Sequence, residues 1–124
     1  MAGIDLCAVS SAELAFLGDS ALEVLVREYI VRHPNGEAPA PRALDFVTAV
    51  RQSEAVERLL PLLCEEESDV FRRGRNSVHG AIPKSASAAE YRRATGMECV
   101  FGLLWMRGEL ERARELFNAA YDLK

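Results

Sequence analysis

Apolar residues recur along most of the chain at intervals of three and four positions, which places side chains on one face of an α-helix. No stretch alternates apolar and polar residues convincingly, as a half-buried β-strand would. The pattern therefore predicts an all-α fold of about six or seven helices. The expected helices cover residues 11–32, 42–52, 54–63, 65–76, 88 into the 90s, 97–107 and 109–122.

Two of these segments are apolar around most of their circumference. The first is the second half of residues 11–32, with Val24–Val26 and Tyr29–Ile30, and the second is residues 97–107. A helix that is apolar on all sides is normally buried. The sequence thus predicts two central helices, with the others packed around them.

Serine and proline suggest where the helices begin and end. The prolines at 34, 39 and 41 predict a loop over residues 34–41, and Pro61 indicates a kink or an end in the helix that contains it. A serine hydroxyl can accept a hydrogen bond from a free backbone N–H in the first helical turn. The expected N-cap residues are Ser10 or Ser11, Ser53 and Ser87.

The first helix contains an unusual pair, Gly18 and Asp19, in its middle. Glycine costs about 1 kcal/mol relative to alanine there, and aspartate competes for backbone hydrogen bonds. Glu23 lies one turn further on and shares a face with Asp19. Two interpretations remain open on this evidence: the carboxylates form a metal-binding edge, or they form a solvated stripe in which Glu23 pairs with Arg27.

Composition narrows the class of protein. The 124 residues suit one domain, and 49% hydrophobic with 27% charged residues is ordinary for a globular protein. No apolar run approaches the roughly 18 residues that a membrane span needs, and no secretory signal is evident. The three cysteines are far apart and no zinc-binding spacing occurs. We therefore expect a cytoplasmic protein, in a reducing compartment, with no membrane partner.

Charge is distributed unevenly along the chain. The formal net charge is −4, yet residues 72–93 contain six basic residues and one acidic residue, a local +5, so the remainder carries −9. Such asymmetry is typical of a basic surface on an acidic body, which would favour a nucleic-acid partner. The alternative is an ordinary solvated helix surface.

Two ordered motifs resemble the ribonuclease III family. The segment Phe16–Leu22, FLGDSAL, resembles the family's signature helix, and Arg92–Gly102, RRATGMECVFG, resembles its second catalytic helix. Between them, Arg72–Asn76, Ile82–Lys84 and the run that starts at Glu90 resemble the Mini-ribonuclease III branch. The resemblance extends from about residue 12 to residue 110. It implies that residues 1–124 form a single catalytic domain of this fold, without a separate double-stranded-RNA-binding domain.

The resemblance implies that Asp19 and Glu98 are the catalytic residues and bind Mg²⁺ directly, with Mn²⁺ as a substitute. Classical members carry a Glu four residues before the Asp and an Asp three residues before the Glu, where this chain has Ala15 and Thr95. The Mini branch shares these departures, and two carboxylates suit one tightly held Mg²⁺ better than two. Thr95 would then orient a water or simply pack within its helix.

The resemblance also implies double-stranded RNA as the partner and a homodimer with Phe16 in its interface. Duplex RNA is recognised mainly through phosphates and 2′-hydroxyls, which suits basic and amide side chains. The loop 77–86 is an element expected to enter a groove. The expected RNA-binding residues are Arg72, Arg73, Arg75, Asn76, Lys84, Arg92 and Arg93.

The expected function is therefore a Mg²⁺-dependent endoribonuclease that cuts double-stranded RNA. By similarity to the Mini branch, its substrate would be the precursor of large-subunit (23S) ribosomal RNA, with a large-subunit ribosomal protein as a candidate assistant. Two alternatives remain: a catalytically silent helical module that binds RNA or ribosome precursor, and a helical protein that only packs against another protein.

Overall fold

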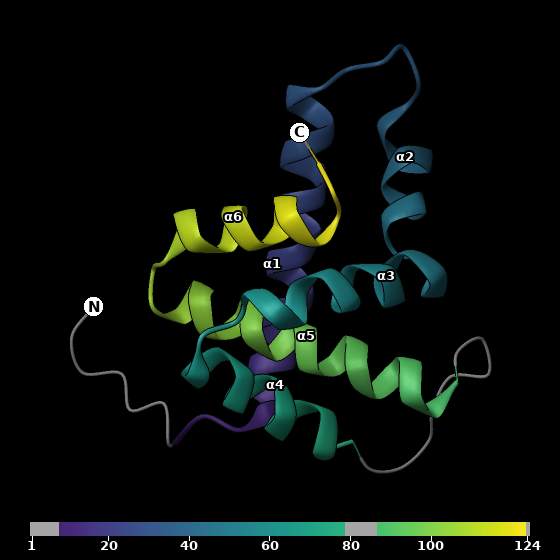
Figure 1. Ribbon diagram of the computed structural model, residues 1–124. Helices are drawn as coiled ribbons and strands as arrows, with labels where there is room; N and C mark the ends of the chain where they lie inside the picture. Colours follow the sequence, from purple (N-terminus) through teal and green to yellow (C-terminus); the bar gives the residue numbers. More distant parts are fainter. Residues whose placement is uncertain (1–7, 79–86, 124) are drawn as a thin grey trace.

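The computed structural model describes residues 8–78 and 87–123. The described residues form six α-helices and a short 3₁₀ turn, with no strand among them, so the all-α prediction is confirmed (Figure 1). None of the described helices is both long and apolar enough to cross a membrane. The elements are α1 (Ser11–Arg32), α2 (Pro39–Phe46), α3 (Ala49–Leu59), η2 (Leu60–Leu62), α4 (Glu65–Asn76), α5 (Ala88–Met106) and α6 (Leu110–Ala120).

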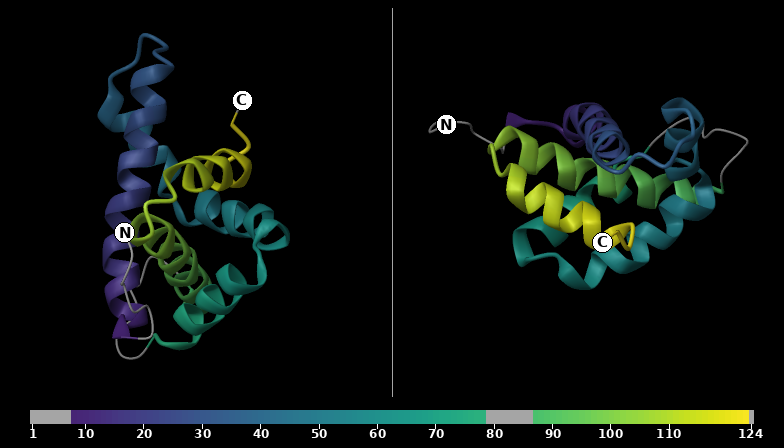
Figure 2. Two further views of the ribbon diagram at one scale, coloured as in Figure 1. Left: turned by 90° about the vertical axis from the view of Figure 1, so that its left-hand side faces the viewer. Right: turned by 90° about the horizontal axis from the view of Figure 1, so that it is seen from above.

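Helices α1 and α5 are the two long helices, and their contact is the most extensive in the molecule. α5 crosses α1 and is covered by α4, α3 and α6, while α1 stands along one edge (Figure 2). Eight of the residues of α5 are buried, including Met97, Val100 and Phe101. The prediction of two central helices is therefore confirmed, although α1 keeps an outer face in solvent.

Glycines allow the backbones of α1 and α5 to touch. A Cβ at Gly18 would overlap the carbonyl oxygen of Glu98 and lie 3.0 Å from the Glu98 Cα. A Cβ at Gly102 would meet the backbone of Leu14 in the same way. Since each helix supplies one glycine to the backbone of the other, the two helices cross more closely than any side chain would permit. This explains why the first helix contains a glycine in its interior.

The N-caps of the long helices follow the sequence. Ser10 and Glu13 exchange hydrogen bonds of 3.0 Å in a capping box, and Ser87 and Glu90 do the same at 3.1 Å. Each box satisfies two backbone N–H groups that a helix start would otherwise leave free. The caps predicted at Ser10 and Ser87 are confirmed, and α5 runs without a break through Gly96.

Residues 39–62 differ from the prediction. A helix over 42–52 and a cap at Ser53 are wrong, because the chain breaks after Phe46 and Thr48 caps α3 by accepting a hydrogen bond from the Arg51 N–H at 3.2 Å. α2 begins at Pro39, inside the predicted loop, because proline at the first helical position forfeits no hydrogen bond. Pro61 marks an end, since α3 stops at Leu59 before the 3₁₀ turn.

An ion pair with a buried carboxylate links α4 to α6. Glu67 of α4 is the buried charged residue of the described core, and Arg112 of α6 donates to its two carboxylate oxygens at 2.9 and 3.1 Å. The same guanidinium donates to the Leu62 carbonyl oxygen at 2.9 Å, while Glu67 accepts from the Cys64 N–H. Burial of a charge is tolerated only when it is paired and hydrogen-bonded, as here.

Replacement of Gly18 by Ala tests the close crossing of α1 and α5. Helix propensity alone would favour alanine by about 1 kcal/mol. The overlap with the Glu98 backbone should outweigh that gain and lower the free energy of unfolding by roughly 1–3 kcal/mol. Urea denaturation measures the change. Ser20→Ala, on the exposed side of the same turn, should stay within about 0.5 kcal/mol of the native protein, and equal values for the two variants would contradict the model of the crossing.

Candidate active site

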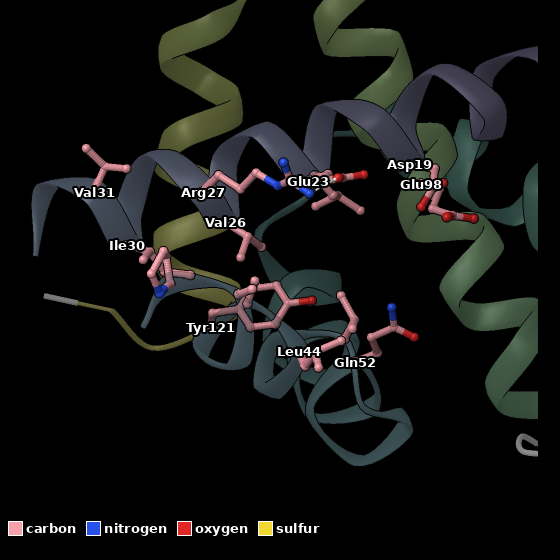
Figure 3. Close-up of a pocket in the computed structure, with 15 residues that line it drawn as sticks. Asp19, Glu23, Val26, Arg27, Ile30, Val31, Leu44, Gln52, Glu98 and Tyr121 are labelled. Carbon is pink, nitrogen blue, oxygen red and sulfur yellow. Dashed lines mark ion pairs between the residues drawn. The ribbon is translucent and has the colours of Figure 1, made fainter. Parts of the chain in front are cut away.

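Asp19 and Glu98 come from different helices and lie side by side at the crossing of α1 and α5 (Figure 3). Gly18 precedes Asp19 and touches the Glu98 backbone, so the glycine contact sets the separation of the two side chains. Asp19 is exposed, while Glu98 is partly buried. The structure thus brings together the two carboxylates that the sequence motifs single out, on the two longest helices of the fold.

Asp19 and Glu98 lie too close together for both carboxylates to be ionised without a free-energy cost. Burial, the negative charge of Asp19 and a hydrogen bond to the Asp19 carboxylate raise the pKa of Glu98 to about 8. Around neutral pH, Glu98 is therefore largely protonated when no cation is present. A divalent cation between the carboxylates would remove the repulsion and release that proton.

The donor set fits Mg²⁺. Mg²⁺ in proteins commonly takes one or two carboxylates and keeps several waters or substrate oxygens. Asp19 and Glu98 supply two carboxylates, and the described residues contain no cluster of three or more His, Cys, Asp or Glu side chains. Such a site leaves most coordination positions for water and substrate, which is the arrangement of a catalytic site rather than a structural one.

The carboxylate pair is shared by two depressions. The first, which we term the apolar groove, has a volume of about 650 Å³ and runs along α1 opposite α2 and Tyr121 (Figure 3). The second, which we term the hydroxyl pocket, has a volume of about 420 Å³ and lies between α1, α5 and the end of α4. The hydroxyl pocket is lined by Ala12, Ala15, Phe16, Asp19, Ser77, Val78, Tyr91, Thr95 and Glu98.

Glu23, the other carboxylate on this face of α1, has a separate partner. It forms an ion pair with Arg27 at 2.6 Å, and both side chains are largely exposed. The interpretation in which Glu23 pairs with Arg27 is therefore confirmed for this residue. Asp19 instead lies next to Glu98, across the helix crossing.

Ala15 and Thr95 both line the hydroxyl pocket, at the positions where classical relatives carry carboxylates. The Thr95 hydroxyl donates to the Tyr91 carbonyl oxygen at 3.0 Å, so it packs within α5. Thr95 also lines the pocket that contains Asp19 and Glu98, and its oxygen keeps the capacity to accept. The hydroxyl can accept a hydrogen bond there, from water or from a ligand.

The basic residues of the predicted RNA surface fall into two groups. Arg72 forms an ion pair with Asp69, and Arg93 forms one with Glu57 of α3. The other three arginines and Asn76 are exposed, and within the described residues these arginines form no ion pair. They are Arg73, Arg75 and Arg92. Lys84 and most of the loop 77–86 lie outside the described residues.

Sequence reasoning gave no individual role to four residues that line the hydroxyl pocket, and two of these, Ser77 and Tyr91, carry hydroxyl groups. Tyr91, Thr95 and Glu98 are spaced by four and three positions, so they share one face of a helix. That spacing could have revealed Tyr91 once Glu98 was singled out. Ser77 follows α4, at the start of the loop expected to contact RNA, and no local signal places it beside Asp19 and Glu98.

Comparison with known proteins agrees with this geometry. The ribonuclease III domain matches residues 12–109, which is most of the chain. A protein from Fusobacterium nucleatum of known crystal structure is similar, with a TM-score of 0.81 and 26% identity over 94% of both chains. The chain therefore belongs to the ribonuclease III family of endonucleases.

Curated relatives define the branch. "Mini-ribonuclease 3" of Symbiobacterium thermophilum is 40% identical over 111 residues, which cover 88% of this chain and 85% of that protein. "Mini-ribonuclease 3" of a Thermoanaerobacter species is 37% identical over 117 residues, with 93% and 82% covered. These similarities place the chain in the Mini-ribonuclease III branch of the family, as its sequence motifs predicted.

The raised pKa of Glu98 predicts how stability depends on pH without a divalent cation. A group whose pKa rises on folding contributes stability below its unfolded value, about 4.5, and loses it as pH rises through the folded value, about 8. In EDTA, Glu98→Gln should therefore gain stability relative to the native protein by roughly 2–4 kcal/mol between pH 4.5 and pH 8.5.

Urea denaturation at several pH values measures this difference. Glutamine keeps the shape of the side chain and can still donate a hydrogen bond to Asp19. Glu111→Gln, an exposed change on α6, serves as the control and should leave the pH profile unchanged. If the Glu98→Gln and native profiles run parallel, the carboxyl group does not titrate in this range.

Proposed function

We propose that this protein is a Mg²⁺-dependent endoribonuclease that cuts double-stranded RNA, with the precursor of large-subunit (23S) ribosomal RNA as its substrate. The observation that carries the proposal is the pairing of Asp19 with Glu98 at the α1–α5 crossing of a ribonuclease III fold. Similarity to relatives named "Mini-ribonuclease 3" supports the choice of substrate.

In the proposed reaction, Asp19 and Glu98 hold Mg²⁺ through their carboxylate oxygens. When bound, Mg²⁺ supplies an activated water and neutralises the charge that develops on the phosphate. Glu98 would give up its proton on binding of the cation, because the two carboxylates would then share one positive partner. Thr95 accepts a hydrogen bond from the attacking water, since the hydroxyl hydrogen of Thr95 is already committed to the Tyr91 carbonyl.

The basic residues near the hydroxyl pocket support an RNA surface on this side of the carboxylates. Arg75 and Asn76 end α4 just before pocket residue Ser77, and Arg92 follows pocket residue Tyr91. Exposed arginines suit the phosphates of duplex RNA. Arg73 extends the same surface. Arg72 and Arg93 form ion pairs within the protein, so part of their role is to stabilise the fold.

Exposed apolar residues on α1 and α2 support a homodimer. Phe16 is 83% exposed, and Val31, Leu44 and Val47 on the rim of the apolar groove are each more than half exposed. A large apolar surface that faces water usually marks an interaction site. A two-fold dimer through this surface would match the symmetry of two antiparallel RNA strands.

Cytoplasmic location and assistance by a large-subunit ribosomal protein complete the proposal. Both are supported by the likeness to the Mini-ribonuclease III branch.

Replacement of Asp19 by Asn tests the assignment of the catalytic site. Residues that only orient metal ligands typically cost 10–100-fold when changed, so loss of a direct ligand should lower cleavage by more than about 100-fold. Cleavage of a labelled RNA duplex in Mg²⁺ and in Mn²⁺ measures this, with thermal melting to verify the fold. Glu111→Gln should cut within about twofold of the native protein. Equal cutting by Asp19→Asn would contradict the site, and duplex binding without cutting by the native chain would favour a silent RNA-binding module.

Replacement of Phe16 by Glu tests the proposed dimer. A carboxylate in an apolar interface would be buried without a partner, so the variant should sediment as a monomer where the native protein is a dimer. Leu62→Glu, which changes an exposed apolar residue on the 3₁₀ turn, should remain a dimer. A native protein that sediments as a monomer at micromolar concentrations would contradict the proposal.

A further inference from the structure

The hydroxyl pocket extends beyond the carboxylates that the proposed reaction uses. Its volume of about 420 Å³ lies in the range of sites that hold small organic groups. Asp19, Glu98 and Thr95 line it together with Ser77 and Tyr91, and Ala12, Ala15, Phe16 and Val78 complete the lining. The pocket therefore combines hydroxyl groups with apolar surface next to the carboxylates.

The hydrogen bond made by Ser77 limits what the pocket can bind. The Ser77 hydroxyl donates to the Gly74 carbonyl oxygen at 2.8 Å, which leaves the Ser77 oxygen as an acceptor only. A phosphate diester carries no hydrogen to donate at neutral pH. A ligand that uses Ser77 must therefore bring its own donor, and in a nucleic-acid backbone that donor is the ribose 2′-hydroxyl.

The remaining wall suits the carbon side of a sugar. Val78 and Ala12 are apolar, and the Tyr91 ring is partly buried. The pocket adjoins Asp19 and Glu98 directly, so a sugar within it would belong to a nucleotide next to the phosphate at the carboxylates. The volume of the pocket, the polarity of its lining and its position beside the carboxylates all fit a ribose.

We propose that the hydroxyl pocket binds the ribose of a nucleotide that adjoins the scissile phosphate, with Ser77 accepting a hydrogen bond from its 2′-hydroxyl. The proposal rests on the function proposed above and adds a positioning residue that distinguishes RNA from DNA. Thr95, three residues before Glu98 in α5, keeps the role of accepting a hydrogen bond from the attacking water.

The test compares two changes that remove the same hydrogen bond. The cut site is first mapped on an all-ribose duplex, and duplexes are then made with one 2′-deoxynucleotide on either side of the cut. One of these substitutions should lower kcat/KM for the native protein about tenfold. Ser77→Ala should lower kcat/KM for the all-ribose duplex by a similar factor. The variant should then cut the sensitive deoxy duplex at the same rate as the all-ribose duplex, because the hydrogen bond is already lost.

Two further variants separate recognition from folding. Ser77→Thr retains the hydroxyl and should restore the native preference for ribose. Ser68→Ala, on the first half of α4 and away from the pocket, should behave as the native protein. The backbone hydrogen bond from the Ser77 N–H to the Gly74 carbonyl, 3.2 Å long, survives in Ser77→Ala, so the end of α4 should stay folded.

The outcomes are distinguishable. If the native protein is indifferent to deoxyribose on both sides of the cut, or if the Ser77→Ala and deoxy effects multiply, the inference is overturned while the nuclease stands. If the native protein cuts no RNA duplex in Mg²⁺ or Mn²⁺, the proposed function and this inference fall together.

Discussion

The contact of backbone against backbone where α1 crosses α5 is the constraint on which the other features depend. Gly18 lies on the Glu98 backbone and Gly102 lies on the Leu14 backbone, so neither helix can move closer or accept a side chain there. The carboxylates at 19 and 98 inherit their spacing from this contact rather than from flexible loops. A site that must hold a small cation gains from this rigidity, because a shift of a fraction of an ångström would change the coordination.

The same crossing also holds two carboxylates where their charges oppose each other. Burial of Glu98 next to Asp19 raises the pKa of Glu98 to about 8, which means that the cation-free fold keeps a proton it would release in water. Active sites and binding sites often hold groups whose pKa is shifted in this way, at a cost in free energy of folding. The stability of the surrounding core offsets that cost. Here that core combines the buried residues of α5 with buried apolar side chains of α1, α3 and α6.

The long helices and their caps could be predicted from spacing and serine positions, because both signals are local in sequence. Residues 39–53 were misassigned because proline both breaks helices and begins them, and only tertiary packing decides between the two roles. The partnership of Asp19 and Glu98 came from family motifs, since residues far apart in the chain carry no common period. Ser77 begins the loop that was expected to contact RNA, but its position beside the carboxylates could not be predicted, because it depends on how the end of α4 packs against α1 and α5.

Helix α2 differs from the rest of the fold in how little holds it. Of its eight residues, only Phe46 is buried, and that ring packs against Phe117 and Tyr121. Local stability follows the number of buried contacts, so α2 should open more readily than the helices that carry the carboxylates. One wall of the apolar groove is therefore adaptable while the opposite wall, α1, is fixed. A molecule that binds in this groove can be accommodated by a displacement of α2, while Asp19 and Glu98 keep their positions at the crossing of α1 and α5.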